Sequence, residues 1–373
     1  MIRNALEGHL VAKSKKDQSN KLHIAVIEGD GIGHEVVPEG IRVLEVIGRK
    51  FDIAYKWERY DWSCERFKKK GAMMPQDGLA QIRDTDAIYL GAVGFPGVPD
   101  HISLWGLLIP IRREFQQYIN LRPVRLFEGV ASPLANRKPG DIDYWIVREN
   151  NEGEYSSIGG RMFEGTENEA AIQQAVFSKK GCERVMRYAF DLAMKRKRRE
   201  VASATKSNGI SISMPYWDER FADVSAEYAK VKTSQFHIDI LCAHLVRHPD
   251  WFDVIVASNL FGDILSDLGP ATTGTIAIAP GGNINPEREF PSMFEPVHGS
   301  APDIAGKGIS NPIGQIWSGA MMLDHLGHHD AAKSIEKAIE TLFAKTTTRT
   351  RDMGGKANCR EMADAVIDII KGQ

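Results

Sequence analysis

The chain has 373 residues, of which 43% are hydrophobic and 26% are charged, and its formal net charge at pH 7 is −2. A chain of this length exceeds the usual size of a single hydrophobic core, so we expect two domains or one elaborate α/β unit. The near-neutral charge argues against nucleic acid as a partner, because proteins that bind nucleic acid usually carry a basic excess.

Neither a signal peptide nor a membrane span is expected. Residues 1–21 are mixed and polar, and no run of 18 apolar residues occurs in the chain. The cysteines form no C-x-x-C pair, which suits free thiols in a reducing compartment. They are Cys64, Cys182, Cys242 and Cys359. We therefore expect a cytoplasmic protein with no membrane partner.

Apolar segments of strand length recur along the chain, and most precede a glycine-containing turn and a helical pattern. The expected strands are His23–Ile27, Ala87–Leu90, Tyr144–Val147, Val201–Thr205 and Phe252–Ala257. The expected helices are Val36–Phe51, Gly181–Arg198, Tyr216–Tyr228 and Asp330–Ala344, the last with Asp330 as its N-cap. The basic runs at 68–70 and 195–199 are interpreted as helix C-termini. This alternation predicts an α/β fold.

Two segments are candidates for nucleotide binding. The first strand leads into Gly29-Asp-Gly-Ile-Gly33, a turn before a helix that allows close approach of an anion. It does not match the G-x-G-x-x-G fingerprint, and the chain has no P-loop, so Rossmann and P-loop folds both lose support. The second candidate is the loop Glu295–Ile304, where Asp303 could accept both hydroxyls of an adenosine ribose.

Acidic side chains interrupt two apolar segments. Asp263 and Asp267 lie four residues apart, so they fall on one face of a helix. At about 5–6 Å their charges repel by roughly 3 kcal/mol at an effective dielectric near 20, which favours a basic partner or a hard divalent cation. The alternative is a solvated acidic helix face. Asp239 is either a hydrogen-bonded core acid or a third ligand.

Basic side chains supply the complementary charge. Arg112, Arg122 and Arg148 could bind carboxylates through both guanidinium nitrogens, although each could equally be a surface charge. Arg148 is the strongest candidate, because it ends an apolar strand and active-site residues favour strand ends. Lys206 ends another strand, where it is either a desolvated base or a lysine whose ammonium reaches solvent.

Taken together, these segments resemble the metal-dependent β-decarboxylating dehydrogenases, the family that includes isocitrate and isopropylmalate dehydrogenases. The resemblance covers the chain from about His23 to its C-terminus. Its most specific motifs, in the family's order, are Gly29-Asp-Gly-Ile-Gly33, Asn120-Leu-Arg-Pro123, Asn259-Leu-Phe-Gly-Asp-Ile-Leu-Ser-Asp267 and Glu295-Pro-Val-His-Gly-Ser-Ala-Pro-Asp303. Similarity to the tartrate and D-malate dehydrogenases rests on Ser103-Leu-Trp-Gly106, Arg112-Arg-Glu-Phe115, Ala204-Thr-Lys-Ser-Asn-Gly209 and Met214-Pro-Tyr-Trp-Asp-Glu219.

The resemblance implies a two-domain α/β fold of the isopropylmalate dehydrogenase type, distinct from the Rossmann fold, with the active-site cleft between the domains. Residues 1–117 and 275–373 would form a large NAD-binding domain from both chain ends. Residues 118–274 would form a small domain with the metal ligands and the dimer interface. The implied assembly is a homodimer whose active sites are shared between subunits.

The resemblance also assigns roles to single residues. Asp263 and Asp267 of one subunit and Asp239 of the other would bind Mg²⁺ or Mn²⁺, with Lys206 as the base and Tyr155 as the late proton donor. The expected substrate-binding residues are Arg112, Arg122, Arg148, Trp105, Leu108 and Ile109. The expected NAD-binding residues are Glu295, His298, Gly299, Ser300, Ala301, Asp303, Ile304 and Asn311. A monovalent cation such as K⁺ is a further candidate cofactor.

The implied reaction is the NAD-dependent oxidative decarboxylation of a small 2-hydroxy diacid, D-malate to pyruvate and CO₂, or the oxidation of tartrate. Asp303 favours NAD, because its charge would repel the 2′-phosphate of NADP. Trp105 leaves little room for an isopropyl group, unless it only packs in the core. Pro110 and the pair Gly281-Gly282 depart from the pattern of similar proteins, and Pro110 should kink or end its helix.

Three other functions remain open at this stage. One is 3-isopropylmalate dehydrogenase, from the same family. Another is a metal-dependent lyase or phosphatase that uses no nicotinamide, for which the chain offers no P-loop or second metal cluster. The third is a non-catalytic ligand-binding subunit of a related heteromer, against which the presence of Lys206, Tyr155 and the three aspartates argues.

Overall fold

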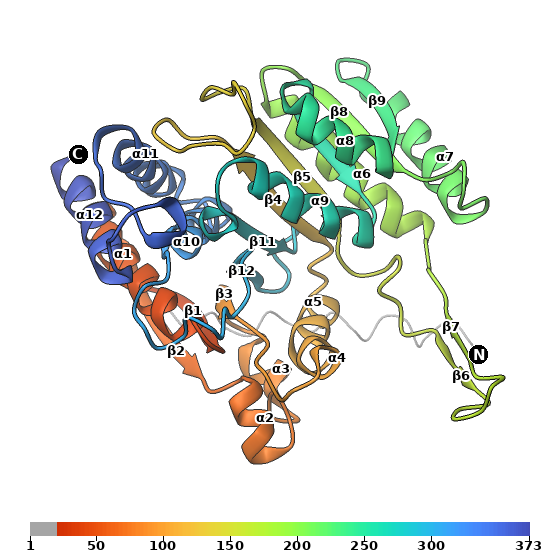
Figure 1. Ribbon diagram of the computed structural model, residues 1–373, viewed down its shortest axis with the longest axis horizontal. Helices are drawn as coiled ribbons and strands as arrows, with labels where there is room; N and C mark the ends of the chain where they lie inside the picture. Colours follow the sequence, from red (N-terminus) through yellow and green to blue (C-terminus); the bar gives the residue numbers. More distant parts are fainter. Residues whose placement is uncertain (1–20) are drawn as a thin grey trace, which may run out of the picture.

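One mixed ten-stranded β-sheet runs through the molecule (Figure 1). The computed structural model describes residues 21–373, and the N-terminal segment for which we expected no signal peptide lies outside them at 1–20. The spatial order of the strands is β2 (Ala54–Tyr60), β1 (Lys21–Gly29), β3 (Ala87–Ala92), β12 (Ser292–Pro296), β11 (Pro280–Ile284), β4 (Ile119–Arg125), β5 (Asp143–Glu149), β10 (Val254–Ala257), β8 (Glu200–Thr205) and β9 (Lys232–His237). The predicted α/β class is confirmed.

The strands of the sheet fall into two groups by sequence. Strands β2, β1, β3, β12 and β11 come from the two ends of the chain, whereas β4, β5, β10, β8 and β9 come from its middle. The groups meet where β11 pairs antiparallel with β4, with Gly282 opposite Leu121. The domain boundaries expected at 117–118 and 274–275 stay predictions, because one continuous sheet crosses from one group to the other.

Helices pack against each group of strands. On the chain-end group these are α1 (Gly33–Phe51) and α10 (Ile313–His325), and α11 (His329–Lys345) and α12 (Cys359–Gly372) pack against these two helices. On the middle group they are α6 (Lys179–Lys195), α7 (Ser213–Ala226), α8 (Ile238–Arg247) and α9 (Asn259–Thr272). Helix α11 begins at His329, so the prediction that Asp330 is its N-cap is wrong. Asp330 lies inside the first turn, where its charge complements the helix dipole.

The basic runs behave as helix ends. The short helix α2 (Cys64–Lys70) closes on Gly71 in the left-handed region at φ 76°, and α3 (Gly78–Ile82) follows. Helix α6 ends at Lys195, three residues before the expected end, and Arg196 then pairs with Asp253. These arginines and lysines therefore have structural roles at helix ends.

The helix around Pro110 contains a widened turn. Helix α4 (Asp100–Ser103) runs into a π-helical turn at Leu104–Leu108 and then into α5 (Ile109–Glu114). The Ile109 N–H donates to the Leu104 carbonyl, five residues back, and Pro110 follows in the first positions of α5. A proline needs no backbone donor there. The expected kink thus takes the form of a π turn, and the chain remains helical.

A separate two-stranded hairpin, β6 (Gly159–Met162) and β7 (Ala170–Gln173), projects from the body of the molecule (Figure 1). Large apolar side chains on it are exposed, including Phe163 at 66% and Ile172 at 53%. An isolated hairpin is marginally stable in water, and exposed apolar patches mark interaction surfaces.

Within residues 21–373, no helix is long and apolar enough to cross a membrane.

Candidate active site

Three adjacent central strands bring a row of buried polar side chains to the middle of the molecule. Asn283 on β11 lies opposite Asn120 on β4, which lies opposite Arg148 on β5. The Asn283 Oδ1 accepts hydrogen bonds from Asn120 Nδ2 and Asn150 Nδ2, both at 2.9 Å. Because buried polar groups are costly without partners, this network holds the strand ends in one arrangement.

The three arginines predicted to bind substrate converge on this network. Arg112 is buried and donates to Glu295 Oε1 at 3.0 Å. Arg122 is also buried and donates to Asn120 Oδ1 at 2.9 Å, while its Nη1 lies 3.7 Å from Asp267 Oδ1. Burial lowers the pKa of Arg122, and it lowers that of Arg148 to about 10 although Asp263 opposes the shift. The site therefore concentrates positive charge in a desolvated place.

Helix α9 presents Asp263 and Asp267 to these arginines. Arg148 pairs with Asp263 and donates twice to Asn259 Oδ1, at 2.7 and 3.1 Å. Burial opposes ionisation of Asp263, but Arg148, the Tyr155 hydroxyl and Arg122 together lower its pKa. Partial burial raises the pKa of Asp267, Arg122 opposes this shift, and Asp263 adds to it. Asp263 and Asp267 therefore lie on one face of α9, as predicted, and this face is turned to the arginine side chains.

A glycine permits the close approach of Arg148 to α9. A side chain at Gly262 would place its Cβ 2.5 Å from the Cβ and Cγ of Arg148. That distance is far below a normal contact, so only glycine lets the arginine cross the helix here.

Lys206 and Asp239 form a second, exposed group. Lys206 follows β8, and its Nζ donates to Asp239 Oδ1 of α8 at 2.7 Å. The Asp239 side chain is 67% exposed, so the alternative that it is a core acid is wrong. The hydrogen bond from Lys206 lowers the pKa of Asp239.

The predicted metal ligands are split within one chain. Across the part of the chain that the structure describes, no three His, Cys, Asp or Glu side chains lie close enough to hold one ion. Asp263 and Asp267 face the arginines, whereas Asp239 contacts Lys206. Carboxylate oxygens are the hard ligands that Mg²⁺ and Mn²⁺ prefer, so the α9 pair fits part of such a site.

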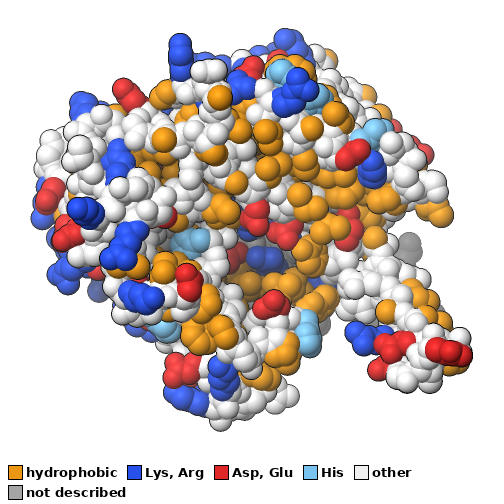
Figure 2. Space-filling view, viewed as in Figure 1, with side chains coloured by type: hydrophobic (Ala, Val, Ile, Leu, Met, Phe, Trp, Pro, Cys, Tyr) orange, Lys and Arg blue, Asp and Glu red, His pale blue; other side chains and the backbone are white. Residues whose placement is uncertain are grey.

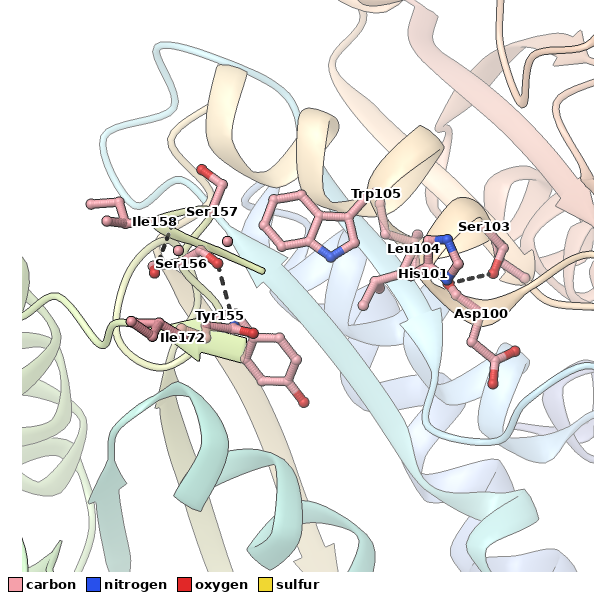
Figure 3. Close-up of a pocket in the computed structure, with 15 residues that line it drawn as sticks. Asp100, His101, Ser103, Leu104, Trp105, Tyr155, Ser156, Ser157, Ile158 and Ile172 are labelled. Atoms are coloured by element: carbon pink, nitrogen blue, oxygen red, sulfur yellow. Dashed lines mark hydrogen bonds between the residues drawn. The ribbon is translucent and has the colours of Figure 1, made fainter. Parts of the chain in front are cut away.

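The surface of the molecule is hollowed near this part of the structure. Figure 2 shows a recess near the centre of the view where Lys or Arg atoms and Asp or Glu atoms gather under apolar surface. An adjoining cavity of about 770 Å³ lies between the helical segment around Trp105 and the base of the hairpin (Figure 3). Trp105 and Leu108 line this cavity, as does Tyr155, whereas Ile109 is buried and does not line it.

Tyr155 is held at three points. Its hydroxyl donates to Asp263 Oδ2 at 2.7 Å, and its carbonyl accepts from Arg113 Nη2 at 2.7 Å. The Arg148 guanidinium lies 5.5 Å from the centre of its ring. Arg113 also lies over the Trp105 ring at 4.9 Å, so one arginine connects the helical segment to the tyrosine loop. Burial and then the bond to Asp263 raise the pKa of Tyr155 to about 12.

The loop after β12, residues 297–311, contains the expected cofactor residues and is tied to α1. The Ile32 N–H donates to the Ser300 carbonyl at 2.9 Å, and the Glu35 carboxylate accepts from Gly306 N and Ser310 Oγ, both at 2.7 Å. Asn311 donates to Asp352 at 3.0 Å. The expected residues Gly299, Ala301, Asp303 and Ile304 lie in the same loop.

Two expected cofactor residues differ in what they offer a ligand. His298 Nε2 is buried and has no hydrogen-bond partner among residues 21–373. Burial lowers the pKa of His298, which keeps the imidazole neutral. Glu295 lies in β12, outside the loop, and its carboxylate is buried against Arg112 and Asn283. It holds Arg112 instead of presenting a free carboxylate to a cofactor.

Several residues complete the site through contacts that the sequence did not reveal. Asn259 and Ser266 of α9, which lie in a recognised motif, hold Arg148 and Arg122, and Arg113 holds Tyr155. Glu149 ends β5 and Glu154 lies in the acidic stretch that follows, and that position was the one available signal. Burial raises the pKa of Glu149 to about 7, although its carboxylate accepts from two backbone N–H groups.

Comparison with known proteins places the chain among dehydrogenases. The isocitrate/isopropylmalate dehydrogenase family model matches residues 23–366. The chain is 58% identical to the D-malate dehydrogenase [decarboxylating] of Escherichia coli and 57% identical to the tartrate dehydrogenase/decarboxylase of Pseudomonas putida, each over 94% of this chain and 98% of the relative. A crystal structure of isocitrate dehydrogenase from Methylococcus capsulatus superposes with a TM-score of 0.85 at 32% identity, over 94% of this chain and 99% of the other.

Proposed function

The chain belongs to the isocitrate/isopropylmalate dehydrogenase family and is an oxidoreductase, and we propose that it oxidatively decarboxylates a small 2-hydroxy diacid with NAD⁺ and a divalent cation. The substrate is D-malate, which gives pyruvate and CO₂, or tartrate. The main support is the cluster of three buried arginines, two α9 carboxylates and one phenol, in which Arg122 lies near Asp267 while Arg148 and Tyr155 contact Asp263. Such a concentration of guanidinium groups suits a ligand with two carboxylates.

The arginines have capacity left for substrate. Arg112 Nε is buried and has no hydrogen-bond partner among the described residues, and only one of its Nη atoms is bound to Glu295. A buried unpaired donor is costly, so a substrate carboxylate would relieve that cost. Arg122 and Arg148 are fixed by Asn120 and Asn259, and they orient the second carboxylate without further ordering.

The carboxylates suit a hard divalent cation. Asp263 and Asp267 would hold Mg²⁺ or Mn²⁺ together with Asp239 of a second copy, because Asp239 does not join them within one chain. When bound, such an ion supplies Lewis-acid polarisation of the substrate oxygen atoms. K⁺ as an additional activator stays a prediction.

Two side chains would move protons. Lys206 of a second copy removes the proton from the substrate hydroxyl as the hydride leaves for the nicotinamide. Tyr155 carries its phenolic proton beside Asp263 and donates it to the enol that remains after CO₂ departs. The arginines keep the remaining carboxylate in place during both steps.

The loop 297–311 would bind the adenosine part of NAD. The unpaired Nε2 of His298 provides one contact. The Asp303 side chain is exposed and its carboxylate accepts no hydrogen bond from residues 21–373, so it is available to ribose hydroxyls. Its negative charge favours NAD over NADP.

The proposed homodimer has a candidate interface. Helices α8 and α9 contact each other and expose the apolar side chains Ile240, Val246, Leu260 and Ile264. The hairpin adds Phe163 and Ile172. Exposed apolar surface of this kind is usually covered by a partner. A dimer joined there would bring Asp239 and Lys206 of one copy towards α9 of the other.

One spectrophotometric assay tests the proposed function. With NAD⁺ and Mn²⁺, we expect NADH formation with D-malate or tartrate, slower turnover with 3-isopropylmalate, and much lower efficiency with NADP⁺. Preference for 3-isopropylmalate would favour the isopropylmalate dehydrogenase alternative. Absence of turnover with every 2-hydroxy diacid would favour a non-catalytic subunit.

A further inference from the structure

Two glutamates in the loop that leads to Tyr155 each bind the N-terminus of a different helix. Glu152 accepts hydrogen bonds from Ser178 N at 2.8 Å and Ser178 Oγ at 2.7 Å, at the start of α6. Glu154 accepts from Ser258 Oγ at 2.8 Å and Leu260 N at 3.0 Å, at the start of α9. The two contacts have the same chemistry, but only α9 contains carboxylates of the active site.

Helix α9 has no cap of its own. The hydroxyl of Ser258, its N-cap residue, donates to Glu154, and the side chain caps no backbone N–H. The first turn of α9 also contains no acidic residue. The first N–H groups of a helix lack intrahelical partners and favour negative charge nearby. Glu154 therefore supplies from another segment the acceptor that α9 lacks.

The same loop contacts α9 at several further points. The carbonyl of Glu152 accepts from Asn259 Nδ2 at 3.1 Å, and the backbone of Gly153, at φ 79°, passes so close that an added Cβ would lie 3.3 Å from Asn259 Cβ. One turn along α9, Asp263 accepts from the Tyr155 hydroxyl. The loop and the helix thus share one interface, with Glu154 at one end and Tyr155 at the other.

From these contacts we propose that Glu154 is a positioning residue for the divalent-cation site. Its carboxylate fixes the start of α9 against the loop, so that Asp263 and Asp267 keep the spacing and direction that a cation requires. Glu154 touches neither the cation nor the substrate. The inference rests on the proposed function, because it takes the two α9 aspartates as metal ligands.

The test is binding of Mn²⁺ to the metal-free full-length protein, followed by electron paramagnetic resonance without substrate or NAD. Loss of an outer residue that orients metal ligands typically costs about 10–100-fold in affinity, and we expect Glu154→Ala to weaken Mn²⁺ binding by that factor. Glu154→Gln keeps an acceptor for the Leu260 N–H, so it should stay within about threefold of wild type. The kcat should fall in Glu154→Ala while the KM for NAD⁺ stays unchanged.

Glu152→Ala is the matched control, because it removes an equivalent contact from α6. Both alanine variants should lower the Tm, since each loses a carboxylate beside a helix N-terminus that is worth about 1 kcal/mol. Only Glu154→Ala should lose Mn²⁺ affinity. If it does not fold, Glu154→Asp takes its place, because it keeps the charge but shortens the reach, and it should also bind Mn²⁺ more weakly.

The outcomes separate this inference from the proposed function. If wild type binds Mn²⁺ and the Glu154 variants bind it equally well, the positioning role is overturned while the proposed function stands. Equal losses in Glu154→Gln and Glu154→Ala would also overturn it, because charge alone would then explain the effect. Failure of wild type to bind Mn²⁺ would overturn both.

Discussion

Two parts of the candidate site differ in how many of their contacts lie within one chain. They are the buried base of the site around Arg148 and the Lys206–Asp239 pair. At the base, the Arg148 side chain is 4% exposed and finds its partners Asn259 and Asp263 within the chain. In the pair, Asp239 is 67% exposed and contacts only Lys206 among the candidate site residues. A buried group that is held by several hydrogen bonds is fixed before any ligand arrives, whereas an exposed pair remains available to a second copy.

The largest expected effect concerns the exposed pair. Lys206→Ala should lower kcat by about 10²–10⁴-fold, because the proposed general base for the hydroxyl proton is lost. The Tm should change little, since ion pairs this exposed contribute little to stability. Steady-state kinetics and thermal unfolding of the purified variant check both. Normal kcat in a folded protein would remove Lys206 from the mechanism.

The next effect concerns the buried strand β5, where burial raises the pKa of Glu149 to about 7 from an ordinary 4.5. Because the folded state then binds more protons than the unfolded state, stability is lost as pH rises from about 4.5 to about 7. That loss amounts to at most about 3 kcal/mol. Glu149→Gln cannot titrate, so its Tm relative to wild type should rise between about pH 4.5 and about pH 7. A constant difference would contradict the burial of an ionisable Glu149.

A smaller effect is expected at the partner of Arg148. Asn259→Ala removes the acceptor of two guanidinium hydrogen bonds and should cost about 2 kcal/mol of stability. Because Arg148 is then less well oriented, the KM for the diacid should rise more than kcat falls. In contrast with Lys206→Ala, both stability and activity change. An unaltered Tm would show that the base of the site is less tightly organised than its contacts indicate.

Sequence patterns located the strands that are apolar and missed those that depend on their neighbours. Strands β1, β3, β5, β8 and β10 were predicted from hydrophobic runs. Strand β2 alternates charged and aromatic residues, β4 contains Pro123, and β11 is rich in glycine. The proline and the glycines weaken the strand propensity of β4 and β11, and pairing within the sheet outweighs this. Strand β2 has aromatic residues that favour strands but no continuous apolar run.

In the candidate site, too, the sequence predicted the local features and missed those that depend on the folded chain. The spacing of Asp263 and Asp267 predicted a shared helix face, because that relation is local. The convergence of Arg112, Arg122 and Arg148 depends on strand order, which no local pattern contains. The resemblance to a family supplied the roles of these residues, whereas the helix-capping contacts of the glutamates became visible only in the folded chain.

The central claim is that each active site takes Lys206 and Asp239 from one copy and Asp263 from the other. Mixing two inactive variants, Lys206→Ala and Asp263→Asn, under conditions that exchange subunits tests it directly. Shared sites predict that each heterodimer contains one intact site, so activity should return to about a quarter of wild type after random exchange. If the mixture stays inactive although heterodimers form, Lys206 and Asp263 act within one chain and the claim is contradicted.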